Sequence, residues 1–174
     1  NIEQIDDAVR RILLVKFELG LFDDPYKYCD LVREKEIIGS KEIMDGALEM
    51  AKKSIVLLKN HKKLLPLKKN GQKIALIGPL AADKNSPLGN WRVAADNNTA
   101  VSVLEGLSNY TGNEIIHSQG VRLVNKIPDG FHEEVKLNLT DKTGIREAKE
   151  VAKKADVVIM VLGEYGFQSG EGRS

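Results

Sequence analysis

Two short apolar runs limit most strongly what this chain can fold into. Residues 73–78 (KIALIG) and 157–163 (VVIMVLG) consist almost entirely of apolar residues and glycine over the length of a strand. Such runs are typical of strands that are buried on both faces of a parallel sheet. Parallel neighbours need a crossover connection, usually a helix, because a tight hairpin joins only antiparallel strands. The two runs therefore predict a mainly parallel sheet with helices on both faces.

The segments around these runs supply the other elements of such a fold. We expect a helix that begins near Ser40, a helix capped by Thr99 and a helix capped by Thr143. Residues 114–117 offer a further short strand, so strands and helices alternate along the chain. This order predicts the α/β class, and specifically an αβα sandwich with a mainly parallel sheet.

The first part of the chain has a different pattern. Apolar residues recur at helical spacing from Ile2 to Leu13, with Asn1 as a possible N-cap and Gly20 just past the last turn. We expect a helix of about five turns here. The stretch that follows contains Asp23, Asp24 and Pro25, a composition typical of a linker. The predicted organisation is a helix over residues 1–22, a linker over 23–39 and the sandwich domain over 40–174.

Composition argues against several classes of partner. The chain has 26 Lys and Arg against 25 Asp and Glu, a formal net charge of +1, so we expect no binding of nucleic acid. A single cysteine, Cys29, and three scattered histidines do not form a recognised zinc-site pattern. The apolar run over residues 157–162 is far shorter than the roughly 20 residues that span a bilayer. We therefore expect no metal, no cofactor and no membrane partner.

The loop after the second apolar run is where chemistry is expected, because ligands of open α/β sheets bind at the carboxyl ends of the strands. Glu171 lies between two glycines there, and its carboxyl group could face outward as a general acid. A merely solvated Glu fits the same pattern. Trp91, the sole tryptophan, follows the first run and could either stack on a sugar ring or close the core.

Other site motifs do not fit the sequence. The first apolar run continues into residues 79–83 (PLAAD), without the G-x-G-x-x-G that brings a backbone against a pyrophosphate. Ser169 is one residue off the G-x-S-x-G pattern of a hydrolase nucleophile, and His117 is expected to be a strand-end histidine rather than a base. Residues 120–141 are long and weakly periodic, which indicates a functional or decorating insertion.

A set of short segments, in a fixed order, resembles glycoside hydrolase family 3, in particular its bacterial β-glucosidase branch. The segments span nearly the whole chain: residues 7–13 (DAVRRIL), 16–23 (KFELGLFD), 54–60 (SIVLLKN), 65–67 (LPL), 73–79 (KIALIGP), 88–91 (LGNW), 155–164 (ADVVIMVLGE) and 169–172 (SGEG). Any one of these segments would be weak evidence, whereas the ordered set is specific.

The resemblance implies a two-domain retaining β-glycosidase. Its TIM-like barrel would supply an aspartate nucleophile, and its α/β sandwich would supply the acid/base. This chain would hold the last barrel helix, the linker and the first part of the sandwich, with the nucleophile outside it. The family's acid/base falls on Glu171, with Glu164 as the alternative, and Trp91 resembles the aromatic residue on the aglycone side of the pocket.

The same resemblance implies what the protein acts on and where. The substrate would be an oligosaccharide or β-glycoside, most commonly one with a terminal β-linked glucose, with β-xylose also open. The partner would be the parent's own barrel domain, and the location periplasmic or secreted. The chain alone is expected to be inactive, because a retaining glycosidase needs both carboxyl groups. A non-catalytic sugar-binding α/β module remains the alternative.

Overall fold

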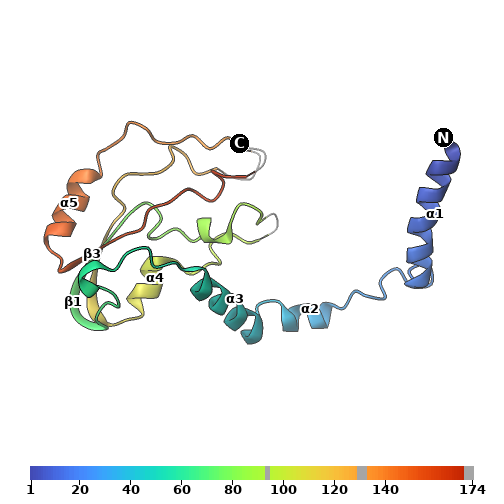
Figure 1. The fold of residues 1–174 in the computed structure, drawn as a ribbon, viewed down its shortest axis with the longest axis horizontal. Coiled ribbons are helices and arrows are strands. Elements are labelled where there is room, and N and C mark those ends of the chain that lie inside the picture. The colour runs from blue at the N-terminus through green and yellow to red at the C-terminus, as the bar shows by residue number, and fades with distance from the viewer. Residues whose placement is uncertain (93–94, 129–132, 171–174) are drawn as a thin grey trace. The chain divides into compact units, whose positions relative to one another are not determined.

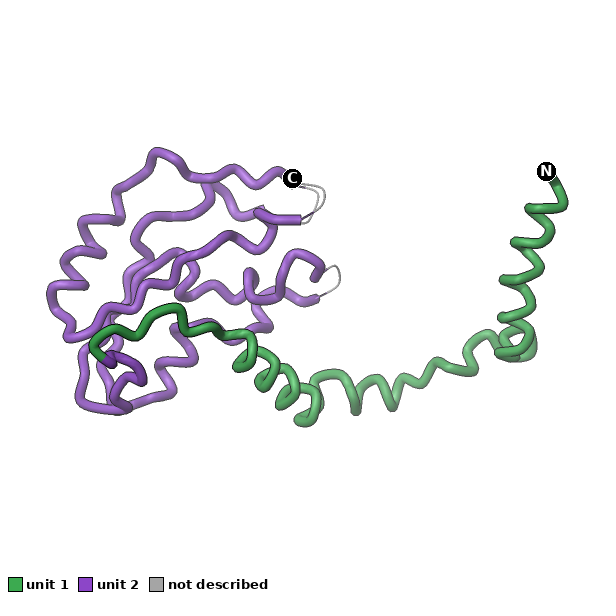
Figure 2. Tube along the Cα trace, in the orientation of Figure 1, with its two compact units in different colours: residues 1–62 green, residues 63–174 purple. Residues whose placement is uncertain are grey.

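The computed structural model describes residues 1–92, 95–128 and 133–170 (Figure 1). The chain divides into two compact units, Asn1–Lys62 and Lys63–Ser174 (Figure 2). This division falls inside the segment that was expected to form the sandwich. The domain limits at residues 22 and 39 stay a prediction.

The first unit consists of three helices, α1 (Ile2–Glu18), α2 (Leu31–Ile37) and α3 (Lys41–Ser54). The Asn1 side chain caps α1 by accepting the N–H of Glu3, at 3.0 Å. Gly20 ends this helix with φ at 71°, while the N–H of Leu21 donates to the carbonyl of Lys16 at 3.0 Å, which are features of a Schellman motif. The predicted five-turn helix is confirmed.

The next two helices show where periodicity was sufficient and where it was not. Ser40 caps α3 as predicted, because its side chain accepts the N–H of Ile43. Helix α2 lies in the segment expected to be a linker, where Asp30 accepts the N–H groups of both Val32 and Arg33. Helix α3 ends at Ser54, and residues 55–58 after it form neither helix nor strand. No helix of the described residues is both long and apolar enough to cross a membrane.

The second unit is built on a parallel sheet with strand order β2-β1-β3. Its strands are β1 (Asn70–Ile77), β2 (Gly112–Ser118) and β3 (Val157–Met160). In the register, Ala75 of β1 lies opposite Ile116 of β2 and Val158 of β3. The two apolar runs and the short strand of the sequence are therefore confirmed as parallel neighbours.

Two helices cover the sheet, α4 (Val103–Ser108) and α5 (Ile145–Lys153). Ala75 and Ile77 pack with Val151 of α5 in one buried cluster. Because successive strand residues point to opposite faces, Ile74 faces the other way, and it lines a small cavity together with Leu107 of α4. One helix thus covers each face, as the predicted αβα sandwich requires (Figure 1).

Two predicted helix caps were wrong. Helix α4 is capped by Ser102 rather than Thr99, and its side chain and that of Glu105 form a reciprocal capping box. Helix α5 has Gly144 at its N-cap position, and the hydroxyl of Thr143 donates instead to Asp141. The S-x-x-E pattern at residues 102–105 was the more specific signal, since it satisfies backbone donors in both directions.

Candidate functional site

The loops that follow β1, β2 and β3 all begin at the same edge of the sheet, because the strands are parallel. A cavity of about 490 Å³ lies at this edge and is lined by residues of all three loops and by His117 of β2. Its polar lining includes Asp83, Lys84, Asn85, Asn98, His117, Gln119, Arg122, Asn125 and Tyr165. The sequence placed chemistry at this edge, and the structure gathers polar side chains there.

The loop after β1 is folded around Asp83. One carboxylate oxygen of Asp83 accepts the backbone N–H groups of Asn85 and Ser86, at 2.7 and 3.1 Å. The Ser86 hydroxyl donates to the other carboxylate oxygen and accepts the N–H of Gly166 at 3.0 Å. Asp83 and Ser86 therefore fasten the loop after β1 to the loop after β3.

Arg92 makes a second connection between these two loops. Its guanidinium carbon lies 4.7 Å from the ring centre of Phe167, a distance that allows a cation–π interaction. The same guanidinium donates to the side-chain oxygens of Asn85 and Asn97, at 3.1 and 3.0 Å. Arg92 is therefore held from the loop after β1 while it stacks on a ring of the loop after β3.

Two described parts of the insertion, residues 120–128 and 133–141, pair in antiparallel fashion, and we call these two parts the arm. Val124 and Leu137 form an isolated bridge, and the N–H of Asn125 donates to the carbonyl of Lys136 at 2.8 Å. Val124 is buried in a small cluster with Tyr165 and Phe167. The arm thus supports the loop after β3, a role that its weak periodicity could not reveal.

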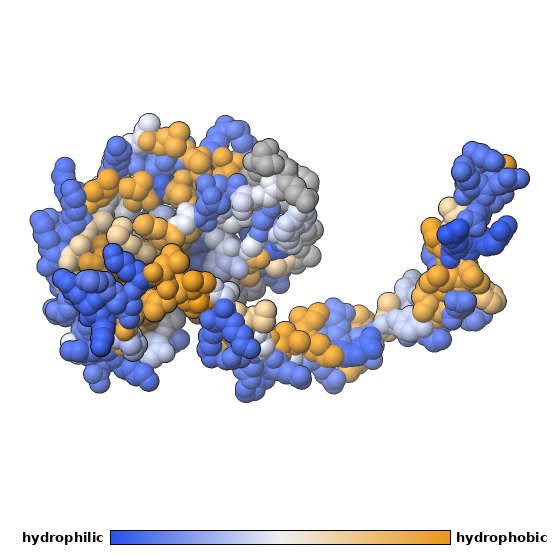
Figure 3. All heavy atoms as spheres, viewed as in Figure 1, coloured by the Kyte–Doolittle hydropathy of each residue, from blue (hydrophilic) through white to orange (hydrophobic). Residues whose placement is uncertain are grey.

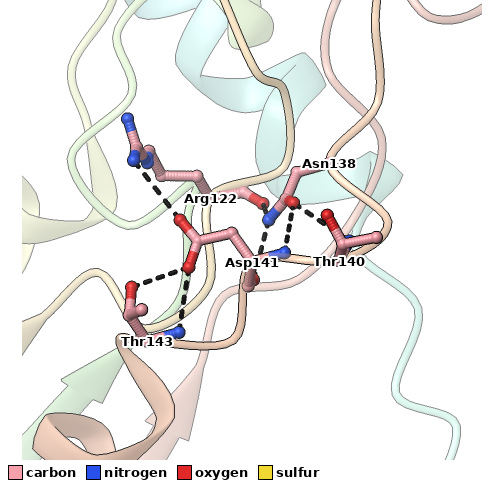
Figure 4. Close-up of polar contacts among 5 residues, drawn as sticks. All are labelled: Arg122, Asn138, Thr140, Asp141 and Thr143. Atoms are coloured by element: carbon pink, nitrogen blue, oxygen red, sulfur yellow. Dashed lines mark hydrogen bonds and ion pairs between the residues drawn. The ribbon is translucent and has the colours of Figure 1, made fainter.

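A polar network closes the base of this arm (Figure 4). Asp141 accepts the N–H and the hydroxyl of Thr143, at 3.0 and 2.7 Å, and pairs with Arg122 at 3.3 Å. Asn138 donates to the carbonyls of Arg122 and Asp141, both at 2.9 Å. The hydrogen bonds from Thr143, followed by the bond and charge of Arg122, lower the pKa of the Asp141 carboxyl below its ordinary value.

Tyr165 lies at the centre of the contacts made by the loop after β3. It is 7% exposed, and its ring meets that of Phe167 edge-on at 6.2 Å. Burial, and then the negative charge of Asp83, raise the pKa of the Tyr165 phenol, while Arg92 opposes the shift. Tyr165 therefore stays protonated at neutral pH.

The structure places one of the two predicted site residues. Trp91 lies in the loop after β1 and is 64% exposed, so it does not close the core. Glu171 lies outside the described residues, although the loop that leads to it is described as far as Gly170. A Cβ atom built on Gly170 would have the side chain of Asn90, the neighbour of Trp91, as its nearest contact. The residues adjoining Trp91 and Glu171 are thus in contact.

Other residues of the site were missed from the sequence. They are Asp83, Ser86, Asn90, Arg92, Tyr165 and Phe167, which connect the loops after β1 and β3. Only the D-x-x-S pattern of residues 83–86, typical of a side chain that folds a local turn, could have marked one of them. Within the described ranges, no group of three or more His, Cys, Asp and Glu residues could hold a metal ion. Glu164 is exposed after the end of β3.

Comparison with known proteins gives both a family and a fold. The profile of the glycosyl hydrolase family 3 C-terminal domain matches residues 55–174. The chain is 38% identical to a periplasmic beta-glucosidase of Salmonella typhimurium, over 98% of this chain and 24% of that protein. It is 35% identical to a beta-xylosidase of Formosa agariphila, over 97% of this chain and 22% of that protein.

A solved structure supports the same similarity. The crystal structure of a beta-glucosidase from Listeria innocua in complex with gluconolactone superposes with a TM-score of 0.75 and 31% identity, over 100% of this chain and 21% of that one. The chain therefore spans about a quarter of the length of the relatives that it matches.

Proposed function

Because the chain belongs to glycosyl hydrolase family 3, whose C-terminal domain matches residues 55–174, we propose that it supplies the general acid/base of a larger retaining β-glycosidase. The observation that carries the proposal is the contact between Asn90 and Gly170. It brings the residues adjoining Trp91 and Glu171 together at the carboxyl edge of the sheet, where ligands of such folds bind.

In this proposal Glu171 performs both proton transfers of a two-step reaction. It protonates the leaving glycosidic oxygen while a second carboxylate attacks the anomeric carbon, and it then activates the water that releases the sugar. The two carboxyl groups must lie about 5 Å apart. As the family resemblance implies, the second carboxylate comes from the enzyme's barrel domain in this proposal. Residues 1–22 are the last helix of that barrel, and a linker over residues 23–39 joins it to the sandwich.

Trp91 is the proposed platform for the aglycone. It is 64% exposed, and an exposed indole can stack on the apolar face of a sugar ring. Arg92, the next residue, is held by Asn85, Asn97 and the ring of Phe167. The backbone that carries Trp91 is therefore tied to the loop that leads to Glu171.

The substrate proposed here is an oligosaccharide or other glycoside with a terminal β-linked glucose or β-linked xylose. The names of the two relatives, a periplasmic beta-glucosidase and a beta-xylosidase, support this class of sugar. The first of these names also supports a periplasmic or secreted location. The chemistry requires only carboxyl groups and water, so the proposal includes no cofactor.

The test compares substrates with good and poor leaving groups in the complete enzyme. Glu171→Ala should reduce turnover of a β-linked disaccharide by about 10²- to 10⁴-fold, since the glycosidic oxygen of the leaving sugar must be protonated to depart. For a nitrophenyl β-glucoside, kcat/KM, which reports the first step, should fall much less, and added azide should restore the turnover that is lost in the second step. Glu164→Ala is the matched control, and it should leave both activities nearly unchanged.

Two results would contradict the assignment. If Glu164→Ala rather than Glu171→Ala produced the leaving-group-dependent loss, the acid/base would be Glu164. If the wild-type enzyme cleaved neither substrate yet bound the disaccharide, the chain would belong to a sugar-binding module.

A further inference from the structure

The carboxamide of Asn90 is buried without a hydrogen-bond partner. Its Oδ1 and Nδ2 atoms both have almost no exposed surface, and neither makes a hydrogen bond within the part of the chain that is described. Burying an amide in this way costs free energy, because its bonds to water are lost and not replaced. Native proteins pair most buried polar groups, so an exception of this kind requires an explanation.

The surrounding contacts hold Asn90 in this position. Four residues earlier in the chain, the Ser86 hydroxyl accepts the N–H of Gly166. Two residues later, Arg92 stacks on the ring of Phe167. The chain is therefore fastened to the loop after β3 on both sides of Asn90.

The carboxamide lies directly against Gly170. A Cβ atom built on this glycine would overlap Nδ2 of Asn90, and it would be 2.9 Å from Cγ and 3.4 Å from Oδ1 of the same residue. Gly170 also has φ at 138°, in a region that side-chain-bearing residues rarely adopt. The backbone that enters Glu171 therefore presents no side chain toward Asn90, and the amide can approach its peptide groups closely.

An amide is suited to bind a peptide backbone, because it has both a donor and an acceptor in one plane. A substrate hydroxyl is a poorer candidate, since the amide atoms have almost no surface that a ligand could reach. The unpaired amide and the bare peptide beside it are thus complementary in position and in chemistry.

We propose that Asn90 is a positioning residue for the general acid/base. In the assembled active site its carboxamide hydrogen-bonds to the backbone of the segment that leads from Gly170 into Glu171, and it thereby sets the direction of the Glu171 carboxyl group. This inference rests on the proposed role of Glu171. It also gives residues 90 and 91 separate tasks, with Asn90 directing the acid and Trp91 supporting the leaving sugar.

The test uses Asn90→Leu in the complete enzyme, because leucine has nearly the same shape but no polar atoms. We expect kcat/KM for a β-linked disaccharide to fall by about 10- to 100-fold, since a misplacement of about 1 Å can have that effect. A nitrophenyl β-glucoside should lose less than about threefold, because its departure needs little protonation. The melting temperature should stay the same or rise, since the variant removes an unpaired buried amide.

Asn113→Leu is the matched control. Asn113 makes the bonds that Asn90 lacks, accepting from the N–H of Gln72 and donating to the carbonyl of Lys68, both at 3.0 Å. It lies in β2 near the amino ends of the strands, away from the site. This variant should lower the melting temperature and leave the ratio of the two activities unchanged.

Glu171→Ala, measured in parallel, separates the two proposals. If Glu171→Ala shows the leaving-group dependence and Asn90→Leu does not, only the role of Asn90 is wrong. If Asn90→Leu lowers the melting temperature and reduces both activities equally, Asn90 is a structural residue. An equal rise in KM for both substrates would mean that it contacts the sugar, and this too would overturn the inference. If Glu171→Ala does not reduce activity on the disaccharide more than activity on the nitrophenyl β-glucoside, the proposed function itself fails.

Discussion

Helix α1 and strand β1 are both rich in apolar residues, but they differ greatly in burial. Leu13 and Phe17 of α1 are 45% and 71% exposed, whereas Ile74, Ala75, Leu76 and Ile77 of β1 are at most 7% exposed. Hydrophobic residues are visible on the surface of the helical unit in Figure 3. Periodicity in a sequence therefore identifies an apolar face, but it does not identify which part of the protein packs on that face.

The two elements are also stabilised differently. Helix α1 has a complete set of local signals, with Asn1 as its N-cap and Gly20 at its end. Strand β1 depends on distant parts of the chain, since it pairs with β2 and β3 and packs on α5. We propose that the barrel domain gives α1 the cover that β1 receives within its own unit.

The largest effect is expected for Leu76→Ala in β1. The Leu76 side chain is fully buried, and its truncation should cost about 4 kcal/mol of unfolding free energy through lost burial and the cavity left behind. Hydrogen exchange of the β1 amides reports the stability of this unit even within a larger enzyme. The control is Leu139→Ala, at a side chain that is 81% exposed, which should change stability by less than about 0.5 kcal/mol.

A smaller loss is expected for Leu13→Ala in α1 of the complete enzyme. If the barrel covers this face, truncation of Leu13 should cost about 2 kcal/mol, at the lower end for a buried leucine. Gln4→Ala on the polar side of α1 is the control and should be close to neutral. Equal melting temperatures for the two variants would mean that the face is not covered, and the contrast between α1 and β1 would then be intrinsic to the protein.

The parts of the fold that could be predicted are those with a repeated signal. The apolar runs of β1 and β3 and the helical spacing of α1 extend over enough residues for a period to be visible. Helix α2 has only seven residues, too few for such a pattern, and only Asp30 marks its start. A single threonine is a weak signal for a cap, whereas the reciprocal pair of Ser102 and Glu105 predicts the start of α4.

The site could be placed by topology but not assembled from the sequence. The carboxyl edge of a parallel sheet follows from the strand order, and that edge contains Trp91 and the loop toward Glu171. The bond between Ser86 and Gly166 joins residues 80 positions apart, and it depends on how three loops meet. No spacing rule predicts such a contact, and Asn90 is identified only by its missing partner.

The helix caps allow a finer comparison of the two units. Ser102 is 3% exposed, and it accepts the N–H of Glu105 while its own N–H donates to the Glu105 carboxylate, at 3.1 and 2.9 Å. Ser102→Ala should therefore cost about 1–2 kcal/mol, whereas Asn1→Ala at the exposed start of α1 should cost about 0.5 kcal/mol. Hydrogen exchange at the first turns of α4 and α1 measures each loss. Equal losses would show that burial of a cap adds nothing to its strength.

The smallest effect is expected for the pH dependence of Asp141 at the base of the arm. Its pKa is lowered from the ordinary value of 3.8, chiefly by the N–H and hydroxyl of Thr143 and then by Arg122. A carboxylate of this kind stabilises the folded state above its unfolded pKa, and the contribution is lost as the pH falls through the lower, folded value.

The amide of Asp141→Asn can still accept the N–H of Thr143 but carries no charge for Arg122. The melting temperature of the wild-type enzyme should therefore exceed that of the variant by a constant amount above roughly pH 5, and the difference should shrink as the pH falls below 3.8. A difference that did not change down to pH values well below this would mean that the ionised carboxylate does not hold the arm in place.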